Sequence, residues 1–85
     1  MPTESSKNDL ANMVEVIAKS LVDLPEDVNV SEVQGENTTV ILLKVAQTDI
    51  GKIIGKEGKT AKAIRTILMG AATKLKRRTV LEIVE

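Results

Sequence analysis

The stretch Ile50-Gly51-Lys52-Ile53-Ile54-Gly55-Lys56-Glu57-Gly58-Lys59-Thr60-Ala61-Lys62-Ala63-Ile64-Arg65 decides the fold. It predicts a short apolar helix, a tight loop bounded by two glycines, and a long amphipathic helix. Glycine reaches positive φ without steric cost, so Gly55 and Gly58 favour a sharp turn and let a ligand approach the backbone. The first N–H groups of the following helix have no intrahelical partner and attract anions. This stretch is therefore predicted to receive an extended polyanion.

Basic side chains surround the glycine loop. The candidate phosphate contacts are Lys52, Lys56, Lys59, Lys62 and Arg65. Side chains three or four residues apart on a helix share a face, so such pairs can act together. Glu57 lies inside the loop, where its charge repels phosphate unless it points away or pairs with Lys56 or Lys59.

The net charge of the chain is zero, but its distribution is uneven. Residues 1–43 hold eight acidic and two basic residues, a net charge of −6. Residues 44–78 hold ten basic and two acidic residues, a net charge of +8. Solvated charged faces are ordinary in small proteins, but the coincidence of this basic region with the glycine loop favours an anion-binding surface.

Composition excludes several classes of function. A length of 85 residues predicts one domain, and the absence of aromatic residues requires an aliphatic core. Without cysteine or histidine, the chain has no disulfide framework, argues against a zinc site and lacks the commonest general base. No apolar run approaches the ~20 residues of a membrane span, and no signal peptide is evident. We expect a cytoplasmic non-enzyme without cofactor or metal.

The segments that precede the glycine loop predict a helix and a β-hairpin. Apolar residues recur at helical spacing from Leu10 to Leu21, and Leu24-Pro25 ends that helix. Val28 and Val30 alternate with polar residues, a turn follows at residues 34–37, and residues 38–45 form a β-branched run. Both faces of this second strand are apolar, so one covers the helices and the other is either exposed or part of an interface.

After the loop, one more helix and one more strand are expected. Ala61, Ile64, Leu68, Ala71 and Leu75 form the apolar stripe of the long helix, and residues 79–84 read as the last strand. A second basic cluster consists of Lys74, Lys76, Arg77 and Arg78. Cations at a helix C-terminus meet its dipole favourably, which explains this cluster structurally, and RNA contact is the alternative.

The element order and the motif together resemble a known family, the KH domain. Its hallmark matches Ile54-Gly55-Lys56-Glu57-Gly58 and continues through Lys62-Ala63-Ile64-Arg65. The order helix-strand-strand-helix-GxxG-helix-strand is that of the prokaryotic type II form. This resemblance implies an α+β fold in which three helices cover one face of a three-stranded mixed sheet. It assigns residues 8–85 to the domain and residues 1–7 to a flexible tail, and it is most similar to the small stand-alone bacterial KH proteins of the KhpA type.

The resemblance also implies a function. KH domains clamp about four nucleotides of single-stranded nucleic acid with the GxxG loop. Gly55, Lys56, Glu57 and Gly58 would then follow the backbone of single-stranded RNA, or of single-stranded DNA. The bases would enter an aliphatic groove lined by Ile53, Ile54 and Ile64, with Val40 or Leu42 opposite. Core packing is the alternative role for each isoleucine.

For proteins of the KhpA type, the resemblance further implies partners and physiology. It implies a homodimer, a heterodimer with a larger Jag/KhpB-type KH protein, or both. It also implies an RNA chaperone or post-transcriptional regulator linked to cell elongation and division.

Other motifs and classes of function account for parts of the same sequence. A phosphate-binding P-loop and a dinucleotide-binding GxGxxG both require glycine where Ile53 stands. A helix-turn-helix DNA reader shares the two helices around a glycine turn, but the preceding hairpin and short first helix count against it. A protein-association adaptor with little RNA binding is the alternative from a different class, and the doubly apolar second strand is its best support.

Overall fold

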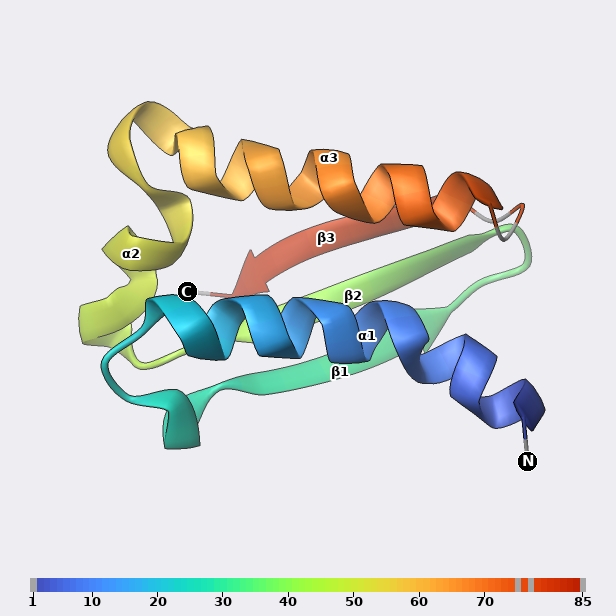
Figure 1. The fold of residues 1–85 in the computed structure, drawn as a ribbon, viewed down its shortest axis with the longest axis horizontal. Helices are drawn as coiled ribbons and strands as arrows, with labels where there is room; N and C mark the ends of the chain where they lie inside the picture. The colour runs from blue at the N-terminus through green and yellow to red at the C-terminus, as the bar shows by residue number, and fades with distance from the viewer. Residues whose placement is uncertain (1, 75, 77, 85) are drawn as a thin grey trace.

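The computed structural model describes residues 2–74, 76 and 78–84, with side chains from Leu10 onward. Its main elements are helix α1 (Pro2–Leu21), strands β1 (Asn29–Gln34) and β2 (Thr38–Lys44), helices α2 (Ile50–Ile54) and α3 (Lys59–Lys74), and strand β3 (Arg78–Val84). This order, shown in Figure 1, confirms the predicted α+β architecture.

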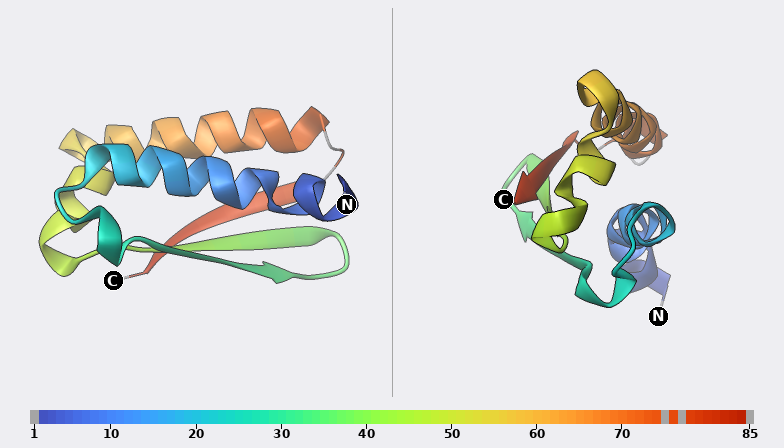
Figure 2. Two further views of the ribbon diagram at one scale, coloured as in Figure 1. Left: turned by 60° about the horizontal axis from the view of Figure 1, so that its bottom comes forward. Right: turned by 90° about the vertical axis from the view of Figure 1, so that its left-hand side faces the viewer.

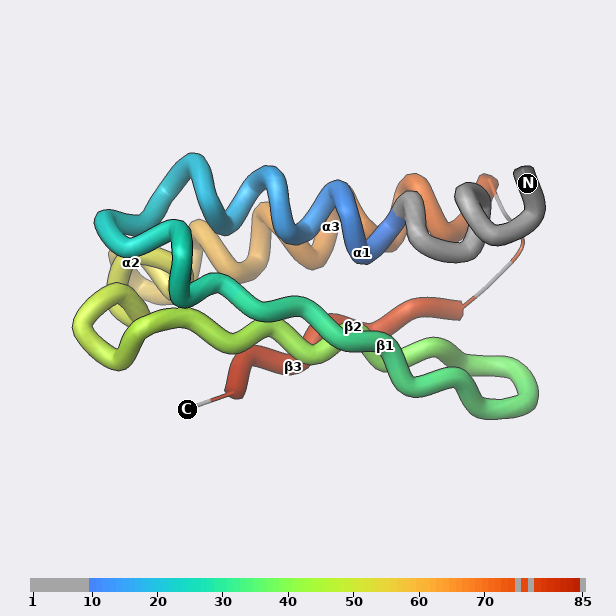
Figure 3. Tube along the Cα trace, turned by 90° about the horizontal axis from the view of Figure 1, so that it is seen from below, coloured from blue at the N-terminus to red at the C-terminus, as the bar shows by residue number. Residues whose placement is uncertain are grey.

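The three strands form one mixed sheet in the order β1-β2-β3. β1 and β2 are an antiparallel hairpin, closed by the Gly35 N–H, which donates to the Thr38 carbonyl at 2.7 Å. β3 returns parallel to β2 after the crossover through α2 and α3. Figures 2 and 3 show two layers, with the helices on one side of the sheet and its other face left open.

Helix α1 is the longest element, with 20 residues, and its backbone is helical from Pro2. The sequence predicts a flexible tail over residues 1–7. In the structure, part of that segment is helical. Met1 lies outside the described residues, and the division into a tail and a domain over residues 8–85 stays a prediction. Within the described ranges, no helix combines the length and the apolarity needed to cross a membrane.

The core is aliphatic and lies between the sheet and the helices. Alternation along β2 turns Ile41 and Leu43 inward, and both are completely buried. The apolar stripes of α1 and α3 cover them, because residues three and four apart share a helix face. The remaining buried members of this cluster are Leu10, Val14, Ala18, Val45, Ile53, Ile64, Leu68, Ala72 and Leu81. Leu75, predicted to continue the α3 stripe, lies outside the described residues.

The other face of the sheet is also partly apolar. Val33, Val40 and Val80 are in register across the three strands, so they share the face that points away from the helices. Val33 is 55% exposed, and Val80 and Val84 are each 39% exposed. The apolar character of both faces of β2, read from the sequence, therefore corresponds to one core face and one exposed face.

Truncation of a buried side chain on β2 tests the position of the core. We expect Leu43→Ala to lower the free energy of unfolding by about 2–5 kcal/mol, because it removes apolar contacts and leaves a cavity. Val16→Ala is the control, because Val16 is 65% exposed on α1 and surface substitutions usually change stability by less than about 0.5 kcal/mol. Urea denaturation measures both, and equal effects of the two variants would contradict this core.

Candidate nucleic-acid interface

The GxxG loop is a sharp reversal between α2 and α3. The Gly55 N–H donates to the Gly51 carbonyl at 2.8 Å and so closes α2, and the Gly58 N–H donates to the Gly55 carbonyl at 3.1 Å. Gly55 has φ 78°, Glu57 has φ 57° and Gly58 has φ 74°. Three of the four loop residues therefore adopt left-handed φ values, which glycine tolerates and which glutamate adopts at a steric cost.

Gly55 is required by close packing as well as by its φ value. A Cβ atom at this position would meet the side chain of Thr60, and it would lie 2.9 Å from the Thr60 backbone nitrogen. A Cβ atom at Gly58 would meet no heavy atom of a non-neighbouring residue within 4 Å. The first glycine thus packs the loop against the start of α3, whereas the second leaves open space beside its backbone.

The loop and the first turn of α3 carry exposed cations. Lys56, Lys59 and Lys62 are all exposed. Lys59 Nζ lies 3.8 Å from Glu57 Oε1, and both side chains are more than 70% exposed. An ion pair of this kind is weak because water and salt screen it. Glu57 is therefore turned toward Lys59, one of the two pairings expected from the sequence.

Lys52 differs from the other cations because two carboxylates hold it. Its Nζ lies 3.2 Å from Asp23 Oδ2 and 3.6 Å from Asp49 Oδ1. The hydrogen bond and charge of Asp23, followed by the charge of Asp49, raise the pKa of Lys52. Lys52 is one of the predicted phosphate contacts, and its positive charge is thus neutralised within the protein.

Asp49 is a residue of this region that the sequence analysis did not single out. It lies at the N-cap position of α2, but its side chain makes no capping hydrogen bond there. Its Oδ2 instead accepts a hydrogen bond of 3.0 Å from the Leu24 N–H, and the side chain is buried. Burial acts to raise the pKa of Asp49, but hydrogen bonds from the Leu24 and Asp23 backbone and the charge of Lys52 lower it overall. The only local signal is the three-residue spacing between Asp49 and Lys52.

Arg65 lies in the second turn of α3 and its side chain reaches the sheet. Its Nε donates to the Leu81 carbonyl of β3 at 3.4 Å. The contact joins the helix to the edge strand, while the side chain remains exposed overall. Arg65 is therefore placed between α3 and β3, farther along the helix than the loop lysines.

The three predicted groove isoleucines have different environments. Ile53 is completely buried and Ile64 is 3% exposed, and both belong to the hydrophobic core. Ile54 is half-buried at the end of α2, next to the loop. Core packing accounts for Ile53 and Ile64, so Ile54 is the one whose surface can meet a ligand without rearrangement.

The predicted position of Val40 and Leu42 is wrong. The sequence analysis placed one of them opposite the helical pair, but Ile41 and Leu43 occupy the core side of β2, and their neighbours point the other way. β2 is also the middle strand, whereas the strand beside α3 is β3, as Figure 1 shows. The alternation of apolar residues along one strand cannot reveal this, because the order of strands depends on where the chain rejoins the sheet after α3.

No cluster of three or more His, Cys, Asp or Glu side chains that could hold a metal ion occurs in the part of the chain that the structure describes. The described site consists of a glycine loop, the N-terminus of α3 and a set of exposed cations. Such a combination offers backbone N–H groups and positive charge to a phosphate backbone.

In this structure a GxxG loop joins two helices, a β-hairpin precedes them and a parallel strand follows them. This order of elements defines a type II KH domain. Residues 11–83 match the family model described as the KhpA/KhpB KH domain. The chain belongs to this KhpA/KhpB KH-domain family.

Curated relatives agree with this assignment. The chain is 53% identical over 75 residues to the RNA-binding protein KhpA of Clostridium perfringens, which covers 88% of this chain and 100% of the relative. It is 56% identical over 69 residues to the RNA-binding protein KhpA of Chlamydia pneumoniae, covering 81% of this chain and 88% of the relative. Its fold is also similar to part of Era from Aquifex aeolicus in a crystal structure with GDP·AlF4⁻, with a TM-score of 0.59 and 24% identity over 87% of this chain and 29% of that one.

Substitution of the two loop glycines separates packing from backbone strain. We expect Gly58→Ala to cost about 1–2 kcal/mol of unfolding free energy, because an L-residue is strained at this φ. Gly55→Ala should cost more, because its Cβ also collides with Thr60. Urea denaturation measures the difference, and a Gly55→Ala variant as stable as Gly58→Ala would contradict the packing described.

The pH dependence of stability tests the contacts of Asp49. Its folded pKa is lowered, below an unfolded value of about 3.9. The stabilisation is therefore present above that unfolded value and is lost as the pH falls through the folded pKa. We expect the stability difference between the wild type and Asp49→Asn, measured by urea denaturation, to be largest near neutral pH and to shrink on acidification. Asp23→Asn is the control, since Asp23 is exposed; a difference for Asp49→Asn that does not change with pH would refute the assignment.

Proposed function

We propose that this chain binds single-stranded RNA by clamping its sugar-phosphate backbone with the GxxG loop. The observation that carries this proposal is the loop itself, in which two glycines with positive φ hold an exposed turn beside the N-terminus of α3. Family membership supports it, because the relatives are named as RNA-binding proteins. RNA binding rather than catalysis is the proposed role, and the cytoplasm is the proposed location.

The two glycines contribute in different ways. Gly55 fixes the turn against Thr60, so the loop has little freedom to collapse onto the helix. Gly58 leaves open space beside its backbone, which lets a ribose or phosphate come into contact. Because the loop is shaped before RNA arrives, less conformational entropy is lost on binding.

The cations have graded roles in the proposed clamp. Lys56 and Lys62 are exposed and form no ion pair with any residue in the described ranges, so they are the first candidates for phosphate contact. Lys59 must exchange its weak contact with Glu57 for a phosphate. Lys52 must compete with Asp23 and Asp49, so we assign it a bracing role for α2 before a phosphate contact.

The bases are held without aromatic stacking, since the chain has no Phe, Trp or Tyr. Proteins that stack bases on aromatic rings gain about 1–3 kcal/mol of binding free energy per base. This chain lacks that contribution. We therefore propose modest affinity, strong salt dependence and limited sequence preference for one domain. Ile54 offers aliphatic surface next to the clamp, and Ile53 and Ile64 support it from the core.

Association would raise the effective affinity by placing two RNA sites in one particle. We propose a homodimer, a heterodimer with a Jag/KhpB-type KH protein, or both, and a role as an RNA chaperone or post-transcriptional regulator in cell elongation and division. The exposed valines of the open sheet face support a second candidate function, that of a protein-association adaptor. That function predicts self-association without nucleic-acid binding.

Charge reversal in the loop tests the RNA clamp. The double substitution Lys56→Asp with Glu57→Asp should weaken binding to single-stranded RNA at least about tenfold, because a charge-assisted contact is replaced by repulsion. Aspartate is acceptable at position 57, since it tolerates left-handed φ better than glutamate. Fluorescence anisotropy at two salt concentrations measures the affinity, with a wild-type slope of about −0.7 in log–log form for each neutralised phosphate.

Lys44→Glu is the matched control for this experiment. It changes the net charge by the same amount, but at an exposed residue outside the loop, at the end of β2. Circular dichroism checks that all variants fold. Equal binding by the double variant and the wild type would reject the clamp, preferential binding to duplex DNA would favour a helix-turn-helix reader, and self-association without RNA binding would favour the adaptor.

A further inference from the structure

The face of the sheet that points away from the helices carries an apolar row across all three strands. Val33, Val40 and Val80 form this valine row, because the strand register pairs Val33 with Val40 and Val40 with Val80. Leu42 and Val84 extend the apolar surface, since alternate residues of a strand share one face. No helix covers this face in Figures 2 and 3. An exposed apolar patch with charges around it is typical of an interaction surface.

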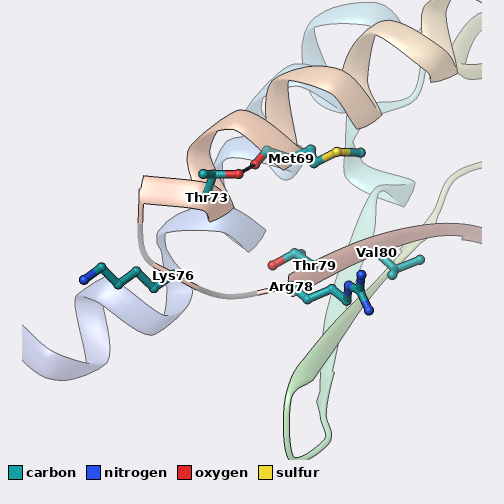
Figure 4. A pocket seen from close by; sticks show the side chains of 6 residues that line it. All are labelled: Met69, Thr73, Lys76, Arg78, Thr79 and Val80. Atoms are coloured by element: carbon teal, nitrogen blue, oxygen red, sulfur yellow. Dashed lines mark hydrogen bonds between the residues drawn. The ribbon is translucent and has the colours of Figure 1, made fainter.

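Two opposite charges lie on either side of the valine row on β3. Arg78 comes two residues before Val80 and Glu82 two residues after it, so all three share one face of the strand. Figure 4 shows the Arg78 and Val80 side chains on the side of β3 that faces away from α3, and the Thr79 side chain on the α3 side. At about 3.3 Å per residue, Arg78 and Glu82 are about 13 Å apart along the strand. They are therefore too far apart to form an ion pair with each other.

Both charges remain available for contacts with another molecule. Arg78 and Glu82 are exposed, and neither forms an ion pair with another residue that the structure describes. They lie at equal distances on opposite sides of the valine row, so a two-fold axis along that row exchanges their positions. Arg78 of one copy then lies opposite Glu82 of a second copy, and the same contact forms twice.

We propose that the open face of the sheet binds a second copy of this chain, with the two-fold axis between the two sheets and parallel to the valine row. The valines of the two copies pack against each other at the centre, and two reciprocal Arg78–Glu82 contacts flank them. A two-fold interface uses the same surface patch on both copies, and this face is complementary to itself in that way. This inference rests on the homodimer proposed above and names its surface.

The same charges argue against other occupants of this face. An RNA strand would bring its phosphates toward the Glu82 carboxylate, which repels them. An uncharged apolar segment would bury Arg78 and Glu82 without partners, and the loss of their hydration is costly. A second copy presents an anion and a cation at the required spacing, so both charges are paired when the apolar surfaces meet.

The small size of the face limits the strength of this association. Three strands of about seven residues cover about 14 Å by 23 Å. A standard interface buries about 800 Å² on each partner, so this contact is at or below the lower end of specific interfaces. Exposed ion pairs contribute little affinity, although they select the orientation. We therefore expect a dissociation constant on the order of 1 μM or weaker.

The proposed arrangement leaves both GxxG loops accessible. Sheets that pack face to face keep their strand directions within about 30° of each other, so the helices stay on the outside of the particle. The loop follows α2, beyond the end of β2 (Figure 1). Because the two-fold axis runs across the strands, it places the two loops at opposite ends of the dimer. Each loop can then hold a separate segment of RNA.

Charge reversal on β3 tests the proposed contacts. Arg78→Glu leaves two carboxylates and Glu82→Arg leaves two cations, so each single variant repels a copy of itself across the axis. An equimolar mixture of the two single variants restores opposite charges at both contacts, and the double variant with both substitutions does so within one chain. Sedimentation equilibrium without RNA measures association between about 10 μM and about 1 mM protein, where weak association is detectable. Urea denaturation shows that each variant is folded.

We expect each single variant to raise the dissociation constant at least about tenfold, because two repulsive contacts replace two attractive ones. The mixture and the double variant should return to within about threefold of the wild type, as coupled pairs do in a double-mutant cycle. Val33→Lys should also weaken association, because it places a charge in the valine row. Val16→Lys is its matched control, since Val16 is 65% exposed but lies on α1, in the helix layer.

The possible failures are distinguishable. If the wild type stays monomeric at about 1 mM, well above the expected range, the homodimer and its surface are both rejected, and the RNA clamp is unaffected. If the wild type self-associates but the single variants do so equally well, or their mixture does not regain association, the sheet face is not the interface. If the single variants lose affinity for single-stranded RNA instead of self-association, the face is an RNA surface and the proposal is also overturned.

Discussion

The close approach of Gly55 to Thr60 is the constraint on which the site depends. Because Gly55 has no Cβ, the chain can pass from α2 into α3 through a tight turn at residues 55–58. That turn leaves the loop residues projecting from the helices, and it sets the direction in which α3 crosses the sheet. The same contact therefore determines both the shape of the candidate clamp and the position of the helix that flanks it.

A second brace holds the short helix from the other side. The buried Asp49 carboxylate accepts the Leu24 N–H, and it shares Lys52 with the exposed Asp23. A five-residue helix has little stability of its own, because helix nucleation is costly. Anchoring α2 to the segment that follows α1 compensates for this. Lys52 is thus better understood as a structural cation near the candidate clamp than as a free phosphate ligand.

The absence of aromatic residues limits the ways in which this chain could hold nucleic acid. Neither the aliphatic core nor the exposed apolar surface contains a ring that could stack on a base. Electrostatic attraction and backbone approach must then provide most of the affinity for nucleic acid. The exposed loop lysines are consistent with this division, and the valines of the open sheet face remain available for association.

The sequence by itself determined the order of elements, the glycine turn, the apolar stripe of α3 and the positions of the cations. These depend on local properties: the periods of two and 3.6 residues, the φ preference of glycine and the placement of charge. Only the tertiary structure decided that Ile41 and Leu43 form the inward face of β2, that β3 rather than β2 lies beside α3, that Ile53 and Ile64 are core residues, and that Asp49 binds a backbone group 25 residues away. Each of these depends on which distant segments pack together, and a local pattern leaves that choice open.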